Sequence, residues 1–101
     1  MKRYNDLLII ERFDKTEYVP ISQVVYCESF KGATKINIVS PDSLLAKRPL
    51  NEVIKVIDDS SFMRINSSQY LNKAYIDRLN ESEQFLTTIL HHKLVFTSKQ
   101  D

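Results

Sequence analysis

The chain has 101 residues, enough for one domain with a single hydrophobic core, and a net charge of +1. This charge excludes a strongly basic protein but not a local basic face, because binding depends on how charge is distributed. One cysteine rules out an intrachain disulfide and suits a reducing cytoplasm, and no apolar run approaches the roughly 18 residues of a transmembrane helix. We expect one cytoplasmic domain over residues 1–101, without a membrane segment, signal peptide or cofactor.

The first third of the chain predicts a β-hairpin and a longer strand. Apolar runs at residues 7–10 and 18–21 flank a charged segment typical of a hairpin turn. Ser22 suits the N-cap of one short helical turn over residues 23–25. Residues 25–29 then predict the next strand.

A second hairpin is predicted around the only glycine of the chain. Gly32 indicates a turn, because glycine readily adopts the backbone angles that turns require. Residues 34–39 are rich in β-branched side chains and predict a strand, and residues 44–47 predict the strand that returns. The turn between them contains Ser, Pro and Asp.

One helix is predicted, beginning at Pro49. Proline suits the first helical position, where its missing N–H would have no partner in any case. Apolar residues then recur at helical spacing and form one stripe, made by Leu50, Val53, Ile54 and Ile57.

The last third predicts further strands, at residues 62–65, 75–79, 85–90 and 93–97. Together with the earlier segments, these predict a chain of short strands with one helix. Short connections throughout favour antiparallel pairing, and no alternation of strands and helices indicates a parallel sheet. The predicted fold class is therefore mainly β with short α.

No group of residues indicates catalysis or a metal. Cys27 lies in an apolar strand and is typical of a buried thiol. His91 and His92 are adjacent, so on a strand they would point to opposite faces, and the chain has no other histidine to complete a site. Asp58 and Asp59 follow the helix in a Ser-rich turn. We therefore expect that the protein is not an enzyme.

Four segments in a fixed order resemble the LytTR family of bacterial DNA-binding domains. The family pattern has a strand like residues 25–29 (VYCES), a helix start like residues 46–50 (AKRPL), the motif of residues 61–68 (SFMRINSS) and a strand entry like residues 71–76 (LNKAYI). The resemblance spans about residues 5–100. It implies elongated antiparallel sheets with short intercalated helices, and binding of double-stranded DNA in transcriptional regulation through loops that enter successive major grooves.

The resemblance and the charge pattern together predict the DNA contacts. The family pattern implies contacts from three segments, at residues 31–35, 66–68 and 99–100. The cations of residues 31–48 lie on two strands expected to pair and suggest a basic face. The predicted contact residues are Lys31, Thr34, Lys35, Lys47, Arg48, Asn66, Ser67, Ser68, Lys99 and Gln100. Asn and Gln can pair with adenine, Lys can reach guanine, and Ser and Lys suit phosphate. The expected partners are duplex DNA, a second copy on a repeated site, and a receiver domain outside this chain.

Other interpretations of these residues stay open. Arg64 is expected to make structural hydrogen bonds, and Asn72 to satisfy turn backbone. Asn66 and Ser67 would also suit a helix N-cap. The family usually has His at the position of Asn66 and often a basic residue at that of Ser67. These departures support an alternative, a degenerate LytTR-like module that binds protein instead of DNA.

Overall fold

A computed structural model describes residues 1–40, 42–80 and 83–96. Within these ranges the chain forms three antiparallel sheets, one α-helix and two short 3₁₀ helices, in a molecule of 44 × 25 × 23 Å. The predicted fold class, mainly β with elongated antiparallel sheets and short helices, is confirmed. No helix among the described residues has the length and apolar character to cross a membrane.

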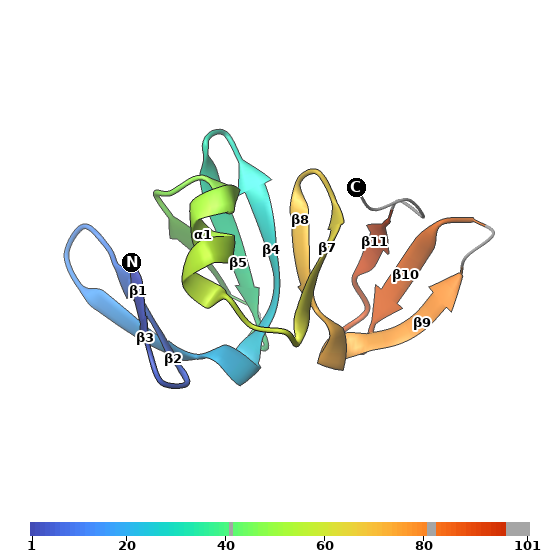
Figure 1. Cartoon of the computed structure of the whole chain (residues 1–101), viewed down its shortest axis with the longest axis horizontal. Helices are drawn as coiled ribbons and strands as arrows, with labels where there is room; N and C mark the ends of the chain where they lie inside the picture. Colours follow the sequence, from blue (N-terminus) through green and yellow to red (C-terminus); the bar gives the residue numbers. More distant parts are fainter. Residues whose placement is uncertain (41, 81–82, 97–101) are drawn as a thin grey trace.

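The three sheets follow one another along the long axis (Figure 1). The first has the order β1-β2-β3, from Lys2–Tyr4, Leu7–Glu11 and Thr16–Pro20. The central sheet has the order β6-β5-β4-β8-β7, from Ser43–Ala46, Ala33–Ile38, Val24–Phe30, Gln69–Asn72 and Phe62–Asn66. The third has the order β11-β10-β9, from Lys93–Val95, Phe85–Thr88 and Ile76–Asn80.

The central sheet is covered on both faces, because successive side chains of a strand point to opposite sides. On β8, Tyr70 packs into a core with α1 and the first sheet, whereas the next residue, Leu71, packs with residues of the third sheet. Strand β4 does the same with Cys27 and Tyr26. Two cores therefore share one sheet.

Helix α1, Leu50–Ile57, begins one residue later than predicted, with Pro49 as its N-cap, and buries Leu50, Val53 and Ile57. Burying such side chains contributes roughly 1.5–3 kcal/mol each relative to exposure. The helix ends at Asp58, which adopts a left-handed conformation with φ 41°. The helix thus packs its buried side chains against one face of the central sheet.

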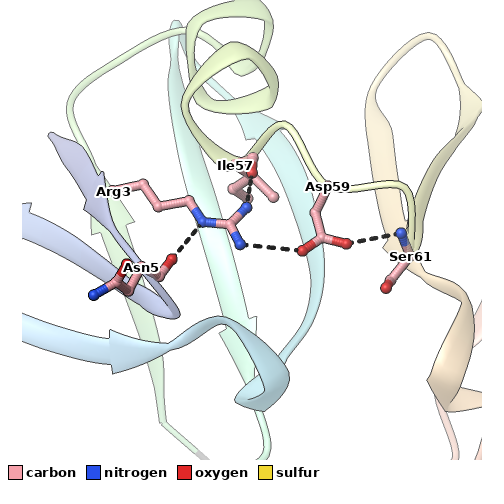
Figure 2. Close-up of polar contacts among 5 residues, drawn as sticks. All are labelled: Arg3, Asn5, Ile57, Asp59 and Ser61. Carbon is pink, nitrogen blue, oxygen red and sulfur yellow. Dashed lines mark hydrogen bonds and ion pairs between the residues drawn. The ribbon is translucent and has the colours of Figure 1, made fainter.

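The C-terminal end of α1 is joined to the first sheet by Arg3 (Figure 2). Its guanidinium donates to the carbonyl oxygens of Ile57 and Asn5 and pairs with the Asp59 carboxylate at 3.3 Å. Asp59 also accepts from the Ser61 N–H at 2.8 Å, and this bond, with Arg3 as a smaller contribution, lowers the pKa of Asp59. A cation at a helix C-terminus interacts favourably with the helix dipole. This contact holds the N-terminal hairpin against the helix.

Several elements differ from the prediction. Strands β1 and β8 were not predicted: β1 is short and polar, and β8 is buried on both faces, so neither shows alternation. The first helical turn is η1, Ile21–Gln23, which begins after Pro20 without a side-chain cap from Ser22. The second 3₁₀ helix is η2, Lys73–Tyr75.

Candidate nucleic-acid interface

Four segments lie at one end of the molecule, the upper end in Figure 1. They are the β4–β5 turn, the β6–α1 connection, the β7–β8 turn and the end of β11, and we call them together the loop end. Hydrogen bonds hold them to their neighbours. Ser29 N–H donates to the Ser68 carbonyl at 2.9 Å, and the Asn66 side chain donates to the Val95 carbonyl at 2.6 Å.

The β4–β5 turn consists of two residues with positive φ, Lys31 at 51° and Gly32 at 81°. Two such residues between paired strands match the geometry that fits the twist of a hairpin. A Cβ on Gly32 would meet nothing within 4 Å, so backbone angle and not space favours glycine. The turn presents Lys31, whose ammonium group lies 5.4 Å from the exposed Phe30 ring.

Thr34 requires a correction. The predicted DNA contact by its side chain does not fit the structure, because Thr34 is fully buried and its hydroxyl donates to the Arg48 carbonyl at 2.8 Å. Strand alternation explains this, since Lys35 points the other way and is exposed. Thr34 therefore holds the β6–α1 connection beside β5.

The cations of the first two segments reach solvent. Lys31, Lys35, Lys47 and Arg48 are all exposed. Arg48 pairs with Glu52 one turn along the helix at 3.6 Å, and such an exposed pair contributes only about 0.3–0.5 kcal/mol. The side chains of Lys35 and Lys47 make no hydrogen bond or ion pair with any residue that the structure describes. Their charge is available to a ligand.

The β7–β8 turn is held by Arg64. Its guanidinium donates to the Ser67 carbonyl at 2.7 Å and to the Asn51 side chain on α1 at 2.6 Å. The expected structural role of Arg64 is confirmed. So is that of Asn72, whose side chain donates to the Val24 carbonyl and accepts from the Ala74 N–H, each at 3.1 Å.

Asn66 ends β7, and Ser67 and Ser68 form the turn that leads into β8, so these residues are not a helix N-cap. The Asn66 side-chain oxygen accepts from the Ser68 N–H at 2.9 Å and from its hydroxyl at 3.2 Å. The Asn66 side-chain nitrogen donates to Gln69 at 2.8 Å as well as to Val95. Ser67 and Ser68 are exposed, and the Ser67 hydroxyl has no hydrogen bond to a described residue.

The predicted contacts Lys99 and Gln100 lie outside the described residues. Two polar residues of the loop end were not predicted. Gln69 donates to the Glu28 carboxylate at 2.8 Å, so both belong to the network of Asn66. Recognising β8 as a strand paired with β4 would have indicated this contact, because Glu28 and Gln69 are direct cross-strand partners.

Cys27 and His92, which the sequence raised as candidates for catalysis and metal binding, are packed within the fold. Burial raises the pKa of Cys27 to about 12, which suppresses its thiolate. His92 contacts the Thr88 hydroxyl at 2.8 Å and packs edge-on against Tyr26, with ring centroids 5.0 Å apart. Across the described ranges, no three His, Cys, Asp or Glu side chains gather as metal ligands would.

Comparison with known proteins identifies the family. The model of the LytTR DNA-binding domain matches residues 14–100. The chain belongs to the LytTR family. A search of curated proteins found no match. The fold of this LytTR domain is similar to that of the LytTr DNA-binding domain of a putative methyl-accepting/DNA response regulator from Bacillus cereus, with a TM-score of 0.76 and 21% identity over 91% of this chain and 86% of the other.

Proposed function

We propose that this LytTR domain binds double-stranded DNA sequence-specifically in transcriptional regulation, with the β4–β5 and β7–β8 turns entering successive major grooves. The proposal is supported by the family and by one observation above all. Lys35 and Lys47 are exposed without an internal partner, on segments that hydrogen bonds hold at one end of the molecule. Because the fold holds the backbone of both lysines in place, phosphate binding would cost mainly the rotamer freedom of the two side chains.

The proposed contacts divide by chemistry. Lys31, Lys35, Lys47 and Arg48 would bind phosphates or guanine, and Ser67 and Ser68 would bind phosphate oxygens. Lys99 and Gln100 remain proposed contacts from the sequence alone. With about 3–5 phosphates neutralised, the logarithm of affinity should fall with the logarithm of salt concentration at a slope of about −3 to −4.5.

A modest number of phosphate contacts favours binding as two copies on a repeated site, since dimers gain affinity and fix the spacing of half-sites. We further propose a cytoplasmic regulator that works with a receiver domain. The related domain from Bacillus cereus is described as part of a response regulator, which supports this pairing.

The test is selection of a randomised duplex library by the purified domain at two salt concentrations, followed by sequencing. We expect enrichment of a direct repeat and a salt slope in the range above. Lys35→Ala should weaken binding and lower the steepness of the slope by about 1 if Lys35 contacts phosphate. The matched control is Lys73→Ala, because Lys73 is exposed on η2, which lies at the opposite end of the molecule in Figure 1.

A second candidate function is protein binding by the same end. It is favoured by the exposure of Phe30, Leu45 and Val95, which are 47%, 40% and 61% exposed. Absence of any enriched sequence, together with binding that salt does not change, would contradict the DNA proposal and leave this candidate.

A further inference from the structure

Asn66 carries the most connected side chain of the loop end. Its amide has two N–H donors and an oxygen that can accept two hydrogen bonds. The side-chain nitrogen donates to the side-chain oxygen of Gln69 and to the Val95 carbonyl. The side-chain oxygen accepts from the N–H and the hydroxyl of Ser68. The protein itself thus satisfies all four positions.

This arrangement conflicts with reading a base. An asparagine that pairs with adenine needs one free N–H and its oxygen at the same time. For Asn66 to do so, the bonds to Ser68 and to Val95 or Gln69 would have to break. Breaking the bonds to Ser68 would loosen the turn, and breaking the bond to Val95 would also separate the turn from the last strand, at a cost that the new pair would have to offset.

The bonds of Asn66 also join parts of the molecule that are distant in sequence. Asn66 ends β7, Ser68 lies in the turn, and Val95 ends β11 of the third sheet. Gln69 extends the network to Glu28 on β4 at 2.8 Å. One amide therefore fixes the β7–β8 turn relative to both the central and the third sheet.

We propose that Asn66 is a positioning residue of the DNA interface and not a base reader. It holds the turn so that the exposed Ser67 hydroxyl, which has no hydrogen bond to a described residue, can donate to a phosphate oxygen, and it keeps β11 beside the turn. Discrimination between bases then falls to other residues, with Lys31, Lys35 and Lys47 as the exposed donors without internal ion pairs among the described residues. This inference rests on the proposed function, although its structural part can be tested without DNA.

The first experiment uses the protein without DNA. Hydrogen exchange is followed by NMR in the wild-type chain, Asn66→Ala, Asn66→Asp and the control Ser67→Ala. Asn66→Ala should speed exchange of the Ser68 amide about tenfold and shift the β11 amides. Asn66→Asp keeps the oxygen that accepts from Ser68 but loses the donors, so it should protect the Ser68 amide and still shift β11. Ser67→Ala should change neither.

The second experiment repeats the duplex selection with the same Ala variants. Asn66→Ala should weaken binding to all selected sequences by about tenfold and leave the base preferences of the wild type unchanged. Ser67→Ala should weaken binding by a smaller factor without altering exchange. Weaker binding with unchanged exchange indicates a lost contact, as expected for Ser67→Ala. Weaker binding with faster exchange indicates a displaced turn, as expected for Asn66→Ala.

Two results would overturn the inference. One is loss of preference at a single base position in Asn66→Ala while its exchange pattern stays that of the wild type. The other is unchanged exchange at Ser68 and unchanged β11 shifts in Asn66→Ala. If Asn66→Ala does not fold, Asn66→Asp gives the same test through β11. If the wild type binds no duplex, the proposed function fails, and the exchange data alone decide the positioning role.

Discussion

Each end of the molecule has an arginine that is bound by the fold, but the loop end also has two lysines whose side chains are left in solvent. At the opposite end, which we call the base and which contains the Arg3–Asp59 contact and the β10–β11 turn, Arg3 is bound by two carbonyl oxygens and a carboxylate. At the loop end, Arg64 is bound in a similar way, but Lys35 and Lys47 are left in solvent. Cations whose donors are satisfied by the fold stabilise it, and cations without such partners are available to a ligand. The contrast predicts that substitution of Arg3 at the base changes stability and that substitution of the exposed lysines of the loop end changes binding.

The largest stability effect is expected at Arg3. Arg3→Ala removes hydrogen bonds to two carbonyl oxygens and leaves Asp59 without its cation, so the free energy of unfolding should fall by about 2 kcal/mol. Urea denaturation measures this loss. The matched control is Arg12→Ala, whose exposed pair with Glu17 at 3.4 Å should contribute less than about 1 kcal/mol. Equal losses in the two variants would remove the distinction between the arginines.

A smaller loss of stability is expected at Thr34, whose buried hydroxyl ties β5 to the β6–α1 connection of the loop end. Thr34→Val has nearly the same shape but lacks the hydroxyl that donates to Arg48, so the free energy of unfolding should fall by about 1 kcal/mol. DNA affinity should fall only modestly, because Arg48 loses its support and not its charge. Thr87→Val is the control, since the Thr87 hydroxyl makes no hydrogen bond to a described residue. A large loss of base preference in Thr34→Val would restore Thr34 as a direct contact.

The smallest effect is a pH dependence at the base. Burial, with the neighbouring His91 as a smaller cause, lowers the pKa of His92. The unfolded state therefore binds the proton more readily, and stability from neutral His92 is complete above the ordinary histidine pKa of about 6.5. It is lost as pH falls through the lower pKa of the folded state. Denaturation from pH 7.5 to 5 should show this decline in the wild type and less of it in His92→Gln. Exposed His91→Gln should keep most of the decline, because burial is the larger cause.

Prediction of the fold from sequence succeeded where one local pattern decides the structure. The stripe at Leu50, Val53 and Ile57 depends on helical spacing alone and is seen. Pro49, predicted as the first helical residue, is the N-cap one position earlier. The hairpin around Gly32 depends on a turn that few residues accept. Strand β8 could not be recognised in this way, because Tyr70, Leu71 and Asn72 are all buried and the alternation of polar and apolar residues disappears.

The sequence by itself determined a mainly β domain of the LytTR type, one helix, and a set of cations and small polar residues near two turns. Periodicity and turn chemistry are local properties, so a single chain shows them directly. Only the tertiary structure decided which of those residues make contacts within the fold and which are left in solvent. It buries Thr34, joins Asn66 to a strand 29 residues later and leaves Lys35 in solvent. A hydrogen bond between distant segments depends on which strands pair, and one shift of register would send each side chain to the opposite face.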